Sequence, residues 1–126
     1  MDTIRAADLL LEESPDNSAS RSYYAAFHAV SALFLLEGRS FTSHKELWIA
    51  FHREMIRSGR WPQEFSDYLR ELRADRETGD YGGAAHVSPQ GAGEAYQAAM
   101  AILEAVNEER PNEFPLEIGG QEGAEE

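Results

Sequence analysis

Residues 16–37 form the most apolar segment of the chain and constrain its fold more than any other part of the sequence. Apolar residues recur there every three or four positions, which is the period of an α-helix. The main stripe comprises Ala19, Tyr23, Ala26, Phe27, Val30, Leu33 and Phe34, and the opposite face carries Ala25, Ala29, Ala32, Leu35 and Leu36. A helix that is apolar on nearly every side is expected at the centre of a bundle, with apolar surface left for a dimer contact.

Helical periodicity also dominates the rest of the chain, whereas strand patterns are weak. The expected helices span residues 2–13, 16–37, 43–59, 62–79 and 88–111. Ser43 and Glu46 have the spacing of a capping box, and Ser88 precedes a proline at a favoured first helical position. Because the connections are short, we predict an all-α, mostly antiparallel bundle of about five helices.

Composition limits the chemistry and the compartment. The 126 residues suit one domain, assigned to residues 1–110, followed by an acidic, glycine-rich tail at residues 111–126 that is expected to be disordered. The chain has no cysteine, which excludes disulfides, thiol catalysis and cysteine-ligated zinc. No apolar run approaches the roughly 20 residues that span a bilayer. We therefore expect a cytoplasmic protein without a membrane anchor.

The charge is unevenly distributed along the chain. A net charge of -12 argues against a general nucleic-acid-binding protein. Between Arg39 and Arg76, however, eight basic residues accompany six acidic ones. This middle segment is either an ordinary mixed surface or the location of a local anion or phosphate site.

Four polar residues share one side of the central helix. Arg21, Tyr24, His28 and Ser31 are spaced i, i+3, i+7 and i+10, so they form a stripe. One interpretation is that Tyr24 and His28 are core residues with satisfied hydrogen bonds. The other is that the stripe lines a cleft or a dimer-interface site.

An arginine ends the apolar stripe of the fourth helix. Phe65, Leu69 and Leu72 define this stripe, and Arg76 is the next residue in phase. A partly buried guanidinium needs an anionic partner. Asp80, expected just past the helix end, or a carboxylate on a neighbouring helix would give a structural ion pair; a bound phosphate would give an anion site.

Several other kinds of site are not indicated. The four histidines lie on four different segments without metal-ligand spacing, and the glycine-rich "GDYGG" lacks the context of a phosphate-binding loop. We expect His44 to be a surface or capping residue and His86 to lie in a loop. No metal or cofactor is expected.

The order of several motifs resembles the HEPN superfamily. These are "SRSYYAAFHAVSALFLLEG", then "SHKELWIAF", then an arginine-rich helix ending in "RETGDY", and a closing helix. The resemblance covers residues 4–109 and is closest to the short HEPN-only proteins encoded beside a minimal nucleotidyltransferase. It implies a dimeric helical bundle. In many members an Arg-x4–6-His motif acts in metal-independent RNA cleavage, with the arginine on the phosphate and the histidine in proton transfer.

This chain matches the motif in part. Arg76 corresponds to the arginine and Glu77 to the polar residue after it, but Tyr81 stands four residues further on and His86 is beyond the span. A phenol with a pKa near 10 is a poor general base at neutral pH. His28 is the candidate substitute if the bundle brings the central helix against Arg76.

Three functional hypotheses follow from the residues and the resemblance. The preferred one is a non-catalytic dimeric module that binds a partner protein, a nucleotide or RNA phosphate near Arg76, as one part of a toxin–antitoxin-like pair. The alternative is a metal-independent ribonuclease toxin with a degenerate Arg-x4-Tyr motif, in which Arg76, Tyr81 and His28 are catalytic. The third is a helical scaffold without a ligand. The predicted ligand-binding residues are Arg21, Tyr24, His28, Arg76, Asp80 and Tyr81.

Overall fold

The computed structural model describes residues 2–10, 13–81 and 86–113, apart from the side chains of residues 2–3 and 75–81. Its elements are α1 (Asp2–Leu9), α2 (Pro15–Leu36), α3 (His44–Phe51), the π-helix η1 (His52–Arg57), α4 (Glu64–Tyr81) and α5 (Pro89–Glu109). The described residues contain no strand. The predicted all-α bundle is therefore confirmed.

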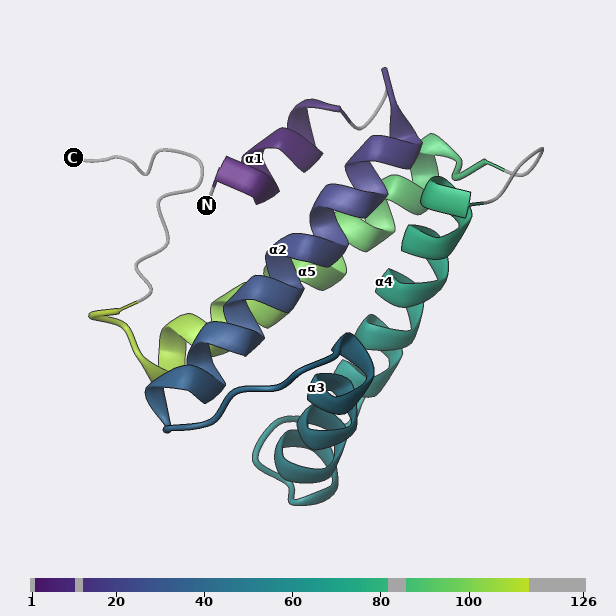
Figure 1. The fold of residues 1–126 in the computed structure, drawn as a ribbon. Helices are drawn as coiled ribbons and strands as arrows, with labels where there is room; N and C mark the ends of the chain where they lie inside the picture. Colours follow the sequence, from purple (N-terminus) through teal and green to yellow (C-terminus); the bar gives the residue numbers. More distant parts are fainter. Residues whose placement is uncertain (1, 11–12, 82–85, 114–126) are drawn as a thin grey trace.

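Helix α2 lies at the centre of the bundle (Figure 1), as its all-round apolar pattern predicts. It packs against α1, α3, α4 and α5, whereas the described residues of α1 and α4 do not contact each other. Ala25 and Ala29, on the second apolar face, are buried together with the main stripe. At the end of the helix, however, Leu35 and Leu36 remain 64% and 43% exposed.

The predicted ends of two helices are wrong. Helix α4 begins at Glu64, because Pro62 belongs to a preceding turn in which its carbonyl accepts a hydrogen bond from the Phe65 amide at 3.1 Å. Gly79 does not stop this helix, which continues to Tyr81. A glycine inside a helix costs only about 1 kcal/mol, which the surrounding helix outweighs. Helix α1 ends at Leu9, and residues 11–12 lie outside the described residues.

The predicted caps are present. Ser43 Oγ accepts from the Glu46 amide at 3.1 Å, and Ser88 Oγ accepts from the Gly91 amide at 2.9 Å. The Glu46 carboxylate accepts from Thr42 Oγ1 at 2.9 Å rather than closing the box on Ser43. Gly38 has a φ of 82°, the left-handed conformation that closes a helix with glycine.

The π-helix η1 continues α3 and was not expected from the sequence. Leu47, Phe51 and Met55 are buried at a helical spacing of four residues, and Ile56 is buried as well. In an α-helix Ile56 would point well away from Phe51, because five residues exceed one turn of 3.6. A π-turn pairs residues i and i+5, so it carries Ile56 back toward the core.

An ionic cluster ties together the loop before α4 and the ends of α2 and α5. Arg60 Nη2 bonds Glu37 at 2.8 Å, and its Nε bonds Glu109 at 2.9 Å. The indole Nε1 of Trp61, which is buried, also donates to Glu109 at 2.8 Å. The hydrogen bond from Arg60, with that from Trp61, holds the pKa of Glu109 below its usual value.

The Glu109 cluster predicts a pH-dependent contribution to stability. Because the pKa of Glu109 is lower in the folded state, its contribution is present above the unfolded pKa, about 4.3, and is lost as pH falls through the folded pKa. Glu109→Gln should lower the free energy of unfolding by about 1 kcal/mol at pH 7. The difference in this free energy between wild type and variant should narrow as the pH falls toward 3. Urea titrations of both proteins across this pH range measure the difference.

Asp67→Asn is the matched control for this prediction. Its ion pair with Arg70 joins side chains that are 68% and 72% exposed, so its loss should leave stability almost unchanged. Equal effects of the two variants at pH 7 would contradict the structural role of Glu109.

Two buried serines of α2 differ in their hydrogen bonding. Ser18 Oγ donates to the Ala7 carbonyl at 2.6 Å and so joins α2 to α1. Ser22 is also fully buried, but its Oγ has no hydrogen-bond partner among the described residues. A buried hydroxyl without a partner destabilises the folded state, whereas a paired one stabilises it.

The serine pair therefore gives opposite expectations for the same substitution. Ser18→Ala should lower the free energy of unfolding by about 1 kcal/mol, because it removes the bond to Ala7. Ser22→Ala should leave stability unchanged or raise it by up to about 1 kcal/mol. Chemical denaturation of both variants checks this, and a loss at Ser22 as large as at Ser18 would contradict it.

Candidate functional site

A basic groove lies between α3 with η1 on one side and α4 on the other. It has a volume of about 820 Å³. Its lining consists of Lys45, Trp48, Ile49, His52, Arg53, Arg57, Ser66, Leu69, Arg70, Arg73 and Ala74. These include five of the chain's eleven lysines and arginines and no acidic residue. The local anion site that the uneven charge suggested would lie here.

The π-helix contributes three of the polar groups in this groove. His52, Arg53 and Arg57 all belong to η1, and all line the groove. Arg53 and Arg57 are four residues apart, which is close to one helical turn, so both side chains reach the groove side. π-Turns within helices occur frequently at functional sites.

The groove cations are only partly neutralised. Arg53 lies 3.3 Å from Glu54, and Arg70 lies 2.5 Å from Asp67. Within the described part of the chain, Lys45, Arg57 and Arg73 form no ion pair. The groove therefore holds three positive charges without an ion-pair partner and two that a neighbouring carboxylate partly compensates. Together they produce a local positive field in a protein of net charge -12.

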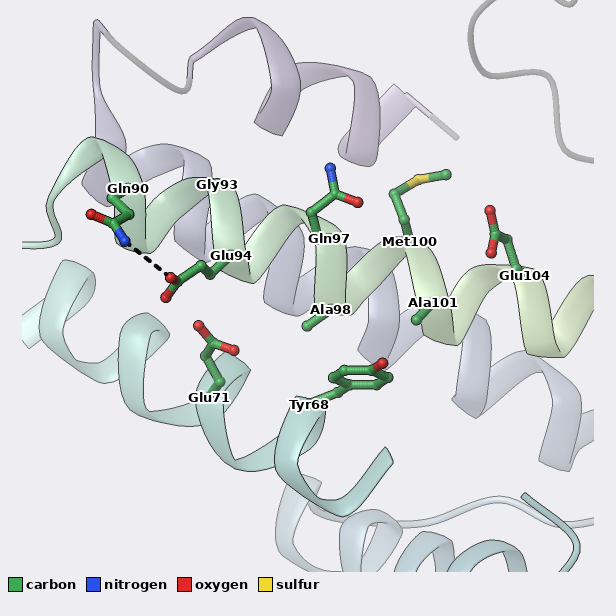
Figure 2. A pocket seen from close by; sticks show the side chains of 10 residues that line it. All are labelled: Tyr68, Glu71, Gln90, Gly93, Glu94, Gln97, Ala98, Met100, Ala101 and Glu104. Atoms are coloured by element: carbon green, nitrogen blue, oxygen red, sulfur yellow. Dashed lines mark hydrogen bonds between the residues drawn. The ribbon is translucent and has the colours of Figure 1, made fainter. Parts of the chain in front are cut away.

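The other side of α4 has the opposite charge. A groove of about 690 Å³ between α4 and α5 is lined by Tyr68, Glu71, Gln90, Gly93, Glu94, Gln97, Ala98, Met100, Ala101 and Glu104. Figure 2 shows the carboxylates of Glu71 and Glu94 close together at one end of this groove. Helix α4 thus separates a basic groove from an acidic one, and the acidic side repels an anionic ligand.

An aromatic cluster lies beside the basic groove, where α2 meets the start of α3. Trp48 Nε1 donates to Tyr23 Oη at 3.0 Å, and Tyr23 Oη lies 2.9 Å from His44 Nδ1. The His44 ring stacks on Phe27, with centroids 3.9 Å apart. His44 is therefore half-buried and hydrogen-bonded, and the prediction that it is a surface or capping residue is wrong. Ser43 supplies the cap instead.

The polar stripe of α2 continues from this cluster toward solvent. Arg21 and His28 are exposed, while Tyr24 and Ser31 are half-buried. His28 is therefore no core residue. The Tyr24 ring lies 6.1 Å from His28 and 6.0 Å from His44, measured between centroids. Tyr24 thus connects the stripe to the start of α3.

The residues predicted around Arg76 belong to α4 in the structure. Arg76, Asp80 and Tyr81 are all helical, so Asp80 does not lie past the helix end as expected. Arg76 follows the groove residue Arg73 by one helical turn. The side chains of residues 75–81 lie outside the described residues, as do residues 82–85. Their convergence with Tyr24 and His28 stays a prediction.

His86 has a structural partner. Its Nδ1 lies 2.8 Å from Asp16 Oδ2, and Asp16 Oδ1 accepts from the Val87 amide at 2.7 Å. These bonds hold the chain before α5 to the start of α2, and the hydrogen bond from His86 lowers the pKa of Asp16. Within the described residues no group of three histidine or acidic side chains is arranged to hold a metal.

Sequence reasoning missed His44 and most of the basic groove. The letters "SHKE" predict only a helix start, although a histidine one residue after the cap lies on the first helical turn. Lys45, Arg53 and Arg57 could be counted as basic, but only the tertiary arrangement of α3, η1 and α4 brings them together with Arg70 and Arg73 around one groove.

Comparisons with known proteins agree with this fold. The family model described as HEPN domain matches residues 1–109. A UPF0332 protein of Thermotoga maritima is 33% identical over 98 residues, which cover 78% of this chain and 74% of the relative. A UPF0332 protein of Gloeobacter violaceus is 38% identical over 92 residues, covering 71% and 73% of the two chains. No solved structure matches significantly.

The bundle with its long central helix is thus a HEPN domain, as the resemblance implied. Its relatives in bacteria and archaea are UPF0332 proteins, including one from Pyrococcus horikoshii that is 35% identical over 74 residues. The chain belongs to the HEPN family and, within it, is similar to these UPF0332 proteins. No helix in the described part of the chain is both long and apolar enough to cross a membrane.

The aromatic cluster predicts that the Tyr23 hydroxyl stabilises the fold. Tyr23→Phe should lower the free energy of unfolding by about 1–3 kcal/mol, because the indole nitrogen of Trp48, only 3% exposed, loses its acceptor. Tyr68→Phe is the control, since that hydroxyl bonds Glu64 at an exposed site. Thermal denaturation compares the stability of the two variants with that of the wild type. Equal losses of stability in both variants would contradict a specific role for the Tyr23 hydroxyl.

Proposed function

We propose that this protein is a non-catalytic, dimeric HEPN module that binds RNA through its phosphates, along the basic groove and onward to Arg76. The observation that carries the proposal is the groove itself, which gathers five of eleven basic residues and no acid in a protein of net charge -12. Phosphate contacts by lysine and arginine supply most of the affinity of nucleic-acid binding. An extended row of cations suits a chain of phosphates better than a single nucleotide.

The absence of catalysis is inferred from the motif. Tyr81 occupies the position where the family's ribonucleases carry histidine, and a phenol does not accept a proton readily at neutral pH. The dimer is supported by the exposed apolar end of α2, where Leu35 is 64% exposed. A minimal nucleotidyltransferase as partner, in a toxin–antitoxin-like pair, is supported by the family resemblance. If such a partner transfers AMP to a tyrosine, Tyr81 is the expected acceptor.

Binding of a labelled single-stranded RNA tests the proposal. Arg57→Glu combined with Arg73→Glu should weaken binding by at least about tenfold at low salt, because two attractive contacts become repulsive. Single alanine variants should each reduce the slope of log K against log salt by roughly 0.7. Fluorescence anisotropy over a salt series gives both quantities.

Arg5→Glu is the matched control for charge. Arg5 is exposed on α1, and the described residues of α1 do not contact α4. Arg5→Glu changes the net charge by the same amount as each groove substitution, but the changed charge lies away from the groove. The proposal would be refuted if the wild type, the groove variant and this control all bound the RNA with the same affinity.

A cleavage assay separates binding from catalysis. The wild-type protein, incubated with RNA and a metal chelator, should leave the RNA intact. Cleavage that disappears in Arg76→Ala would instead establish the ribonuclease alternative and overturn the non-catalytic assignment.

A further inference from the structure

The basic groove has an apolar centre. Its lining includes three large apolar side chains, those of Trp48, Ile49 and Leu69. Trp48 and Leu69 are buried, so they belong to the core and expose little surface to the groove. Ile49, by contrast, is 51% exposed. The groove therefore offers a ligand accessible apolar surface as well as positive charge.

Basic residues flank Ile49 along the helix. Lys45 precedes Ile49 by four residues and Arg53 follows it by four, and all three line the groove. Four residues are close to one helical turn, so a cation lies about one turn away on either side of Ile49. On α4, across the groove, Leu69 is followed four residues later by Arg73. Each side of the groove thus combines an apolar residue with a neighbouring cation.

Its position in the groove distinguishes Ile49 from the other exposed apolar side chains. Leu9, Leu35 and Leu36 are also exposed, but they line neither the basic nor the acidic groove. Single apolar residues on a protein surface are ordinary. Ile49 instead extends a buried apolar wall into a hollow lined by cations, which suits a ligand that carries both negative charge and apolar surface.

An unpaired stretch of RNA is such a ligand. Its phosphates are anionic, and the faces of its bases are accessible because the strand is not held in a duplex. In a duplex the same faces are covered by the neighbouring base pairs. Proteins that bind single strands combine a cationic groove with side chains on which the bases pack. A chain of phosphates without bases would leave the apolar surface of Ile49 uncovered.

We propose that the centre of the basic groove is a subsite for an unpaired RNA base, which packs on Ile49 while the surrounding cations hold the flanking phosphates. Ile49 is then the residue that determines the preference of the groove for single-stranded RNA. This inference rests on the function proposed above and names the form of RNA that the groove takes.

Three probes separate contacts to bases from contacts to phosphates. They are a labelled single-stranded RNA, the same RNA as a duplex, and inorganic polyphosphate. Ile49→Ala should weaken binding of the single strand by about three- to tenfold, because the apolar contact to the base is lost. Binding of the duplex and of polyphosphate should stay within about twofold of wild type, and the slope of log K against log salt for the single strand should not change, since no phosphate contact is removed. Fluorescence anisotropy measures the two RNAs, and isothermal titration calorimetry measures polyphosphate.

Two further variants serve as a charge test and a control. Ile49→Lys replaces apolar surface by a cation, so it should strengthen polyphosphate binding and lower the ratio of single-strand to polyphosphate affinity by at least about threefold. Equal gains for both ligands would show that charge alone governs the site and would contradict the inference. Leu9→Ala removes an exposed apolar side chain from α1 and should leave the binding of all three probes unchanged. Circular dichroism confirms that each variant is folded.

The outcomes distinguish this inference from the proposed function. If Arg57→Glu/Arg73→Glu loses affinity for the single strand while Ile49→Ala binds it like wild type, the base subsite is refuted and the groove stands. If neither variant loses affinity, the proposed function itself fails. Equal losses of RNA and polyphosphate binding in Ile49→Ala would also overturn the inference, because Ile49 would then act on the phosphate contacts. A changed oligomeric state of Ile49→Ala in sedimentation experiments would assign the residue to a contact between two copies of the chain instead.

Discussion

The burial of α2 is the constraint on which the rest of the structure depends. Its two apolar faces cannot be covered by one neighbour, so α1, α4 and α5 pack around it and α3 contacts it at Tyr23 and Phe27. Fully buried Val30, Leu33 and Phe34 belong to this helix. Because apolar burial is the dominant favourable term in folding, the positions of the other helices follow from this requirement.

The arrangement around α2 also divides the charges of α4. One side of α4 faces α3 and η1 across the basic groove, while the other packs against α5 and borders the acidic groove. Such separation creates a local field that a net charge of -12 conceals. Clefts lined by one sign of charge focus that field and raise the local concentration of oppositely charged ligands.

The aromatic cluster links this groove to the polar stripe of the central helix. Tyr23 belongs to the core stripe, yet its hydroxyl joins Trp48 and His44. Arg21 and His28, which face solvent, continue the stripe beyond it. Arg21, Tyr24 and His28 of this otherwise apolar helix thus lie where the bundle meets solvent, whereas Tyr23 is buried and its hydroxyl bonds side chains of α3.

The sequence by itself determined the class of fold, because a period of three to four residues and local caps depend on neighbours along the chain. Ser43 and Ser88 cap helices as predicted. Only the tertiary structure decided the π-turn, the extension of α4 past Gly79 and the basic groove. The π-turn depends on a core that accepts Ile56, and the groove joins side chains far apart in sequence. Such features arise from packing between helices, which local pattern does not encode.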